Sequence, residues 1–201
     1  MAEQHASQGK RPLSLKIAGR QGELDAAEFL AVAEAVRDLG LGRVLLTSGQ
    51  RLLLPGLDPD QAETLRERLG PLLVQGHDLV QSCPGRGACK FARAETRGMA
   101  AELETLIRSL DLPAKVKAGV SGCPHCCAES RVRDLGFIAG ARGWTVVFGG
   151  NAGKRPRSGD ELGRELSDQE ALDLARSALE DYARLARPGE RTARFQESLN
   201  R

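Results

Sequence analysis

Four of the five cysteines in this 201-residue chain form two closely spaced pairs that could hold a metal centre. Cys83 and Cys89 have C-x5-C spacing, and Cys123 and Cys127 have C-x3-C spacing. Glycine and proline accompany both pairs, which predicts tight turns that aim several thiolates at one point. The pattern therefore favours a soft metal centre, with an iron–sulfur cluster as the first interpretation.

Two other interpretations of the cysteines stay open at this point. Zinc could be bound by Cys123 and Cys126, together with Cys83 and Cys89, although C-x5-C is not the usual zinc spacing. The thiols could also be inert and buried. Disulfides are not expected, because residues 1–15 contain no charged-then-apolar leader and we therefore expect a reducing, cytoplasmic compartment.

Two further segments could bind anions. In the expected strand over 112–122, alternation places Lys115 and Lys117 on one face, as a cationic wall for a small oxyanion. Solvated lysines on an amphipathic strand are the simpler explanation. The segment 149–157 is a glycine loop with an amide and three cations, which suits an anionic ligand, although such loops are often only turns. Its candidate binding residues are Gly149, Gly150, Asn151, Lys154, Arg155 and Arg157.

The composition excludes several classes of protein. The formal charge is only +2 and aromatic residues make up 3%, which argues against a nucleic-acid-binding protein. No apolar run approaches the ~18–20 residues that would span a bilayer, so we expect no membrane partner. The 23 glycines suit a backbone that packs closely against a large cofactor.

The expected elements give an α+β fold of two lobes. In residues 12–78, capping boxes and periodicity predict strand, helix, strand, strand, helix and strand, the order of a ferredoxin-like lobe. These elements are expected over 12–18, 25–40, 43–47, 51–54, 58–70 and 72–80. Residues 79–201 contain both cysteine pairs. Helices are expected there over 91–110 and 167–185, strands over 112–122, 137–141 and 144–148, and a short helix at the C-terminus.

The order of these motifs resembles the sirohaem-containing nitrite and sulfite reductases, over roughly residues 12–200. The resemblance implies that Cys83, Cys89, Cys123 and Cys127 ligate a [4Fe-4S] cluster and that Cys127 also bridges to the sirohaem iron. Cys126 fits no ligand position. It further implies that Lys115 and Lys117, in a P-x-K-x-K strand, contact the bound anion, and that the glycine loop packs on the sirohaem carboxylates.

The resemblance extends to the turn at 47–51 in the first lobe. It implies that Thr47, Gln50 and Arg51 contact the sirohaem, which is expected at the junction of the lobes. Gly49 replaces the arginine of the family's T-x-R-Q-like turn. Two arginines that larger members place at the anion are also missing, at 14–16 and 76–78. The chain holds one repeat instead of two, which is similar to the small assimilatory-type sulfite reductases.

The implied activity is that of an oxidoreductase, the six-electron reduction of sulfite to sulfide or of nitrite to ammonia. Electrons would come from an external donor protein such as a ferredoxin and pass through the cluster. An alternative is an electron-transfer or sirohaem-handling iron–sulfur protein with little reductase turnover, because part of the family's anion-binding set is missing.

Overall fold

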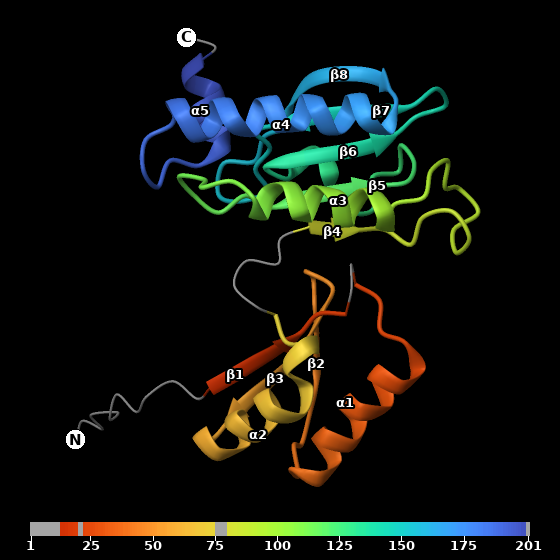
Figure 1. The fold of residues 1–201 in the computed structure, drawn as a ribbon, viewed down its shortest axis with the longest axis vertical. Helices are drawn as coiled ribbons and strands as arrows, with labels where there is room; N and C mark the ends of the chain where they lie inside the picture. The colour runs from red at the N-terminus through yellow and green to blue at the C-terminus, as the bar shows by residue number, and fades with distance from the viewer. Residues whose placement is uncertain (1–12, 20–21, 75–79, 200–201) are drawn as a thin grey trace, which may run out of the picture. The chain divides into compact units, whose positions relative to one another are not determined.

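The described residues form two β-sheets, one in each of the units Met1–Gln75 and Gly76–Arg201. The computed structural model describes residues 13–19, 22–74 and 80–199 (Figure 1). Helices and strands occur in both units, as the α+β expectation requires.

The first unit contains the strands β1 (Leu13–Ile17), β2 (Leu45–Thr47) and β3 (Arg51–Leu57). They form an antiparallel sheet in the order β1-β3-β2. Helices α1 (Ala26–Asp38) and α2 (Pro59–Leu69) connect the strands, and a 3-10 turn covers Gly70–Leu72. Leu73 then bridges to Ile17 on the free edge of β1. The spatial order is therefore Leu73, β1, β3, β2, as in a split βαβ unit.

The expected fourth strand of this unit is reduced to that bridge among the described residues. The N–H of Val74 donates to the carbonyl of Lys16 at 2.8 Å, and residues 75–79 lie outside the described part. Val80, the last residue of the expected strand, instead begins a strand of the second unit.

Both helices of the first unit begin at the predicted capping boxes. The N–H of Glu28 donates to Asp25 and that of Gln61 donates to Asp58, each at 2.8 Å. Each box satisfies backbone groups that the first helical turn would otherwise leave unpaired. The apolar faces of the helices pack with the strands in a core that includes Ile17, Val32, Leu54, Leu57, Leu65 and Leu69.

The second unit contains a five-stranded sheet in sequential order, β4 to β8. Its strands are Val80–Ser82, Ala118–Ser121, Leu135–Ala139, Trp144–Phe148 and Asp160–Leu166. The first three are parallel, and the last two are antiparallel to their neighbours. Helices α3 (Arg97–Arg108) and α4 (Asp168–Leu185) cover one face, which we call the helix face (Figure 1). Helix α5 (Thr192–Leu199) ends the described chain.

The opposite face of this sheet carries the chain that connects β5 to β6, including the 3-10 turn Ser130–Val132. We call it the crossover face. Gly119 and Gly136 make the close approach possible, since a Cβ would stand 2.7 Å from the Ala128 carbonyl oxygen and 2.0 Å from that of Ser130. Ser121 and Ser130 are joined by a hydroxyl hydrogen bond of 2.8 Å. The crossover is therefore fixed directly on β5 and β6.

Several expected boundaries in the second unit were wrong. The helix expected over 91–110 begins at Arg97, because residues before it form a loop in which Arg93 N–H donates to Gly122 at 2.6 Å. The strand expected over 112–122 covers only Ala118–Ser121, and the one expected over 137–141 lies at 135–139. Strand β8 was not expected, since its sequence lacks an apolar alternation.

Candidate metal and anion site

The two cysteine pairs begin at the same edge of the second sheet. Cys83 follows β4 directly, and Cys123 stands two residues after β5. Because β4 and β5 are neighbouring parallel strands, both loops leave from their carboxyl ends. The N–H of Gly122 donates to the sulfur of Cys83 at 3.1 Å, so the second loop already contacts a thiol of the first.

The Cys89 loop lies against the Cys123 loop. The N–H groups of Arg93 and Ala94 both donate to the carbonyl of Gly122. The rings of Phe91 and His125 form an edge contact with centroids 4.9 Å apart. These contacts connect all the predicted ligand segments within one loop cluster.

A turn at Gly85 holds the first loop in place. Its φ of +68° is a conformation that favours glycine, and a Cβ there would lie 2.6 Å from the Thr96 hydroxyl. That hydroxyl donates to the carbonyl of Cys83 at 2.7 Å. A side chain at position 85 would therefore disturb the loop that carries Cys83 and Cys89.

All five cysteines are free thiols with different exposure. Cys83 and Cys123 are buried, Cys89 and Cys126 are partly buried, and Cys127 is exposed. Over residues 13–19, 22–74 and 80–199, no group of three or more His, Cys, Asp or Glu side chains already forms a metal site. The four thiols on two connected loops fit an iron–sulfur cluster by donor chemistry. Their assignment as its ligands stays a prediction.

Cys126 belongs to a turn of the crossover. It has a φ of +58°, and its sulfur accepts the N–H of Arg131 at 3.4 Å. Its carbonyl accepts the N–H of Glu129 at 2.8 Å. These contacts give Cys126 a local role in the turn, and its exclusion from the cluster ligands stays a prediction.

Lys115 and Lys117 immediately precede β5 and are both exposed. Val116, Ala118 and Val120 belong to the core on the helix face. The alternating positions therefore point to the crossover side, where Gly119 and Ser121 contact the crossing chain. Lys117, directly before the strand, thus shares a side with the segment that carries Cys126 and Cys127, and the same orientation of Lys115 stays a prediction.

Asp134 fixes the position of Lys117. Its carboxylate accepts the backbone N–H of Lys117 at 2.8 Å and the guanidinium of Arg191 at 2.6 Å, and the Thr192 hydroxyl also donates to it. The Asp134 side chain is only 5% exposed. Sequence reasoning did not single out this residue. The sequence feature that could have indicated Asp134 is its place directly before an apolar strand, because a carboxylate buried at such a position needs a polar partner.

Tyr182 lies beside this network. Its hydroxyl donates to the carbonyl of Glu190, and its ring contacts Phe148 and Phe195. Burial and the negative charge of Asp134 raise the pKa of Tyr182 to about 12. The C-terminal segment is therefore tied to the start of both β5 and β6 by polar groups.

The glycine loop follows β7 and leaves from the same sheet edge as Lys117, since Phe148 pairs with Leu135 and Leu135 with Ala118. Its predicted binding groups differ in availability. Arg157 donates to the Gly149 carbonyl and to Asp160, both at 2.7 Å. Asn151 donates to the Arg155 carbonyl at 2.7 Å. Lys154 and Arg155 are exposed, so they are the cations best placed for an external anion.

Gly150 explains why this loop lies close to the crossover. A Cβ there would stand 2.3 Å from the Arg133 carbonyl oxygen, and the N–H of Gly159 donates to the Arg131 carbonyl at 2.7 Å. The crossover thus runs from the edge with Cys123 to the edge with Lys117 and the glycine loop.

The predicted sirohaem-contacting turn of the first unit is the β2–β3 hairpin. Thr47 pairs directly with Arg51, so their side chains share one face of the sheet. The Thr47 hydroxyl donates to the Arg51 carbonyl at 3.1 Å, and Gln50 has a φ of +58°. The hairpin geometry is therefore well defined within this unit.

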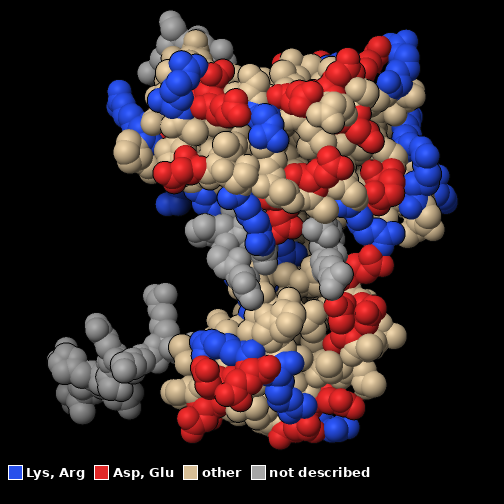
Figure 2. Space-filling view, viewed as in Figure 1, with Lys and Arg blue, Asp and Glu red and all other residues tan. Residues whose placement is uncertain are grey.

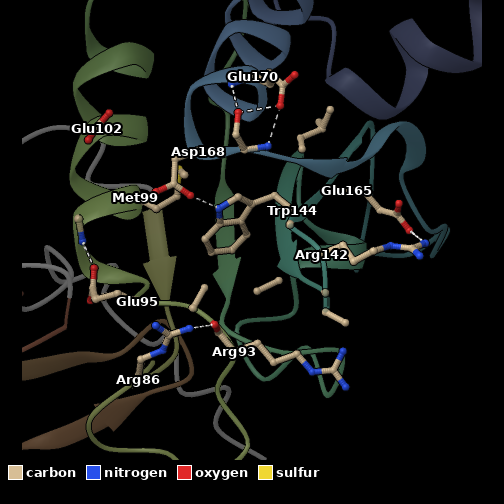
Figure 3. A pocket seen from close by; sticks show the side chains of 18 residues that line it. Arg86, Arg93, Glu95, Met99, Glu102, Arg142, Trp144, Glu165, Asp168 and Glu170 are labelled. Atoms are coloured by element: carbon tan, nitrogen blue, oxygen red, sulfur yellow. Dashed lines mark hydrogen bonds and ion pairs between the residues drawn. The ribbon is translucent and has the colours of Figure 1, made fainter.

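A cavity of about 640 Å³ opens beside the first cysteine loop (Figure 3). It lies between the starts of α3 and α4 and the turn after β6, with Trp144 donating to Asp168 at 2.6 Å. Burial opposes ionisation of Glu95 on its wall, but backbone N–H groups of Gly98 and Arg97 outweigh this and lower its pKa. None of the described residues that line the cavity is a predicted ligand.

On the face that Figure 2 shows, Lys and Arg are interspersed among Asp and Glu. Within the described part of the chain, no helix combines the length and apolar character that crossing a membrane requires.

Comparison with known proteins gives matches for both units. Residues 76–200 match the family described as "Nitrite and sulphite reductase 4Fe-4S domain", and residues 6–72 match the "Nitrite/Sulfite reductase ferredoxin-like half domain". The assimilatory-type sulfite reductase of Nitratidesulfovibrio vulgaris is 40% identical over 76% of this chain and 72% of its own length.

Longer relatives match over a smaller share of their length. The Emericella nidulans nitrite reductase [NAD(P)H] is 32% identical over 89% of this chain but only 17% of its own. The solved structure of the Mycobacterium tuberculosis NirA protein has a TM-score of 0.79 at 24% identity, over 92% of this chain and 38% of that one. That of a dissimilatory sulfite reductase I has a TM-score of 0.74 at 16% identity, over 93% and 68%. Both solved structures support the fold alone.

Proposed function

Because the chain belongs to the nitrite and sulfite reductase family, we propose that it reduces sulfite to sulfide, or nitrite to ammonia, with electrons from an external donor. One observation carries this proposal. The 4Fe-4S domain of the family matches residues 76–200, which contain all five cysteines, both lysines and the glycine loop.

Membership confirms the expected class of protein. An oxidoreductase of the sulfite and nitrite reductase type, with a [4Fe-4S] cluster and sirohaem, was predicted from the motifs and is confirmed at the level of the family. The choice between sulfite and nitrite, the donor and the residue roles belong to the proposal.

We assign Cys83, Cys89, Cys123 and Cys127 as the cluster ligands. The N–H of Gly122, which already donates to the Cys83 sulfur, would stabilise negative charge on a ligating thiolate. When bound, the cluster would relay electrons from the donor, and the sirohaem would supply the iron at which S–O or N–O bonds break.

We assign Lys115 and Lys117 to the substrate anion. Their ammonium groups would balance its charge and donate protons to its oxygen atoms as these leave. The hydrogen bond from the Lys117 backbone to Asp134 holds the chain at this point, so that the side chain starts from a fixed position.

The sirohaem has eight carboxylates and needs several polar contacts. We assign these to the Thr47–Arg51 hairpin and to the glycine loop, through Thr47, Gln50, Arg51, Gly149, Gly150, Asn151, Lys154, Arg155 and Arg157. In the loop, Lys154 and Arg155 would bind carboxylates directly. Asn151 and Arg157 would act through the loop shape that their hydrogen bonds maintain.

The donor is proposed to be a small acidic electron-transfer protein such as a ferredoxin. A relative named ferredoxin–nitrite reductase, from Synechococcus elongatus, is 27% identical over 79% of this chain. The exposed cation Lys90 directly follows Cys89, and the exposed Arg93 lies further along the same loop. Both would attract an acidic surface to the loop that carries this proposed cluster ligand. Free thiols and such a donor fit a reducing compartment, which we propose to be the cytoplasm.

The test is anaerobic purification followed by iron, zinc and sirohaem analysis and an absorption spectrum. We expect a Soret band, a red chlorin-type band, and oxidation of reduced methyl viologen that depends on sulfite or nitrite. Both cofactors without turnover would favour the alternative of an electron-transfer or sirohaem-handling protein. One zinc per chain without iron would exclude the proposal.

A further inference from the structure

Arg133 ends the crossover, directly before Asp134 and β6, and its side chain lies on the crossover face. Its Cγ stands 3.1 Å from the position that a Cβ on Gly119 would take. One terminal nitrogen, Nη2, donates to Gln81 on β4 and to Glu129 at 2.7 Å. The guanidinium therefore lies above β5 and is held there from two sides.

The Nε–H group of the same guanidinium has no acceptor. It is the buried side-chain nitrogen without a hydrogen-bond partner in the described parts of the chain. A buried donor without an acceptor is unfavourable, so such a group marks a place where a polar ligand is missing. The Nε atom itself is buried, whereas other atoms of the side chain are exposed, to 17% for the side chain as a whole.

The surroundings of Arg133 favour an anion as that ligand. Lys117 lies two positions before Gly119 on β5, so its side chain points to the same side of the sheet. Glu129 neutralises one positive charge through its ion pair with Arg133. Asp134, the nearest other carboxylate in sequence, is instead occupied by Arg191 and Thr192.

We propose that the Nε–H of Arg133 binds an anionic oxygen, next to Lys117 on the crossover face. The oxygen belongs either to a carboxylate of the sirohaem or to the substrate oxyanion. Both offer the same chemistry to a guanidinium, which binds carboxylates and other oxyanions through paired N–H groups. This inference rests on the proposed function and adds a binding residue that the sequence motifs did not indicate.

A purely structural role would need only the Nη2 contacts. Gln81 and Glu129 both accept from that one nitrogen, so an ammonium group at the end of a lysine could replace the tether in part. A lysine has no equivalent of the inward Nε–H. Arg133→Lys therefore separates ligand binding from tethering, and Arg133→Gln removes both.

The experiment compares Arg133→Lys, Arg133→Gln, Arg131→Gln and Glu129→Gln with the wild-type chain, all purified anaerobically. Arg131 is the matched control, because it is an exposed arginine on the same turn. Glu129→Gln weakens the tether but keeps Nε–H. Iron and sirohaem per chain are measured first, and sulfite is then titrated against the sirohaem absorption bands.

We expect both Arg133 variants to keep normal iron. If the ligand is a sirohaem carboxylate, sirohaem content falls while both controls retain it. If the ligand is the substrate, sirohaem content is unchanged and the sulfite concentration at half-saturation rises by about 10–100-fold, as expected for one charge-assisted hydrogen bond.

Three results would overturn the inference. Arg133→Lys could match the wild-type chain in both measurements, Glu129→Gln could reproduce the Arg133→Gln defects, or Arg131→Gln could do so. A wild-type chain that binds no sirohaem would contradict the proposed function first and this inference with it. Normal wild-type cofactor content with unaffected Arg133 variants would contradict this inference alone.

Discussion

The Asp134 carboxylate accepts the backbone N–H of Lys117 at 2.8 Å, which joins the buried start of β6 to the residue proposed to bind the substrate. The same carboxylate holds Arg191 and Thr192 at the start of α5. One buried charge thus fixes three segments that are distant in sequence. Because the bond to Lys117 uses its main chain, the side chain remains available for the anion.

Replacing Asp134 with Asn should lower the free energy of unfolding by about 2–3 kcal/mol, because Arg191 would lose a buried charged partner. Urea unfolding of the purified chain would measure this. The control is Glu161→Gln, whose ion pair with Arg164 is exposed and should change the unfolding free energy very little. Equal effects of the two changes would show that the Asp134 network contributes no more than a surface pair.

Tyr182 should titrate near pH 12, where a free tyrosine titrates near 10, because burial and Asp134 disfavour its phenolate. It is the one tyrosine of the sequence, so tyrosinate absorbance reports it alone. Since the folded pKa is raised, its contribution to stability is full below pH 10 and is lost as the pH rises to 12. Tyr182→Phe is the control without a signal. A folded-state midpoint near 10 would contradict the buried environment.

The sequence predicted those elements whose signals are local. Capping boxes at Asp25 and Asp58 placed two helix starts correctly, because each is decided by groups three residues apart. The helix expected from residue 91 instead starts at Arg97, since Arg93 and Ala94 bond to Gly122, far along the chain. Strand β8 was missed because its sequence has no strand periodicity of its own. It forms because it pairs with β7.

The candidate site shows the same division. Residue type, spacing and the family resemblance predicted roles for the cysteines, the lysines and the glycine loop, and these roles stay predictions. Residue type and spacing could not show that the side chains of Arg157 and Asn151 form hydrogen bonds within the loop. These bonds depend on where Asp160 and the Arg155 carbonyl lie in the folded chain. Residue type and spacing also could not identify Asp134 or Arg133, whose importance arises from burial and from neighbours on other strands.

A single Cys→Ser substitution at any of the four proposed ligands should lower iron content and remove visible colour, because a missing thiolate opens the cluster to solvent. The four positions are Cys83, Cys89, Cys123 and Cys127. Cys126→Ser should keep normal iron and is the matched control, since the Cys126 sulfur accepts the Arg131 N–H. Iron analysis after anaerobic purification decides the result. Iron loss in Cys126→Ser, with normal iron in Cys127→Ser, would reassign the fourth ligand.

Changes in the glycine loop should separate into two kinds. Arg155→Ala removes an exposed cation and should lower sirohaem content while the melting temperature stays near the wild-type value. Arg157→Ala removes the hydrogen bonds to Gly149 and Asp160 and should lower both the sirohaem content and the melting temperature. Sirohaem extraction and thermal unfolding would measure these effects. An Arg155→Ala chain with full sirohaem would remove this side chain from the cofactor site.

Lys115→Met and Lys117→Met should leave the absorption spectrum unchanged and lower turnover of sulfite and nitrite. An ammonium group matters most while negative charge and protons meet at the breaking bond, so its loss affects the transition state more than cofactor binding. Removing one such donor from a water-poor site typically costs ~10²–10³ in rate. Turnover is measured with reduced methyl viologen, which does not depend on a docked donor protein.

Lys90→Met is the control for the lysine changes, because it removes the same charge from an exposed position beside Cys89. With the small reductant it should keep wild-type turnover, since its proposed role is to attract a protein donor. The Lys117 variant should also unfold at the wild-type urea concentration, because the bond to Asp134 comes from its backbone. Full activity of Lys117→Met with both anions would place substrate binding elsewhere, and a loss shared by Lys90→Met would point to a general charge effect.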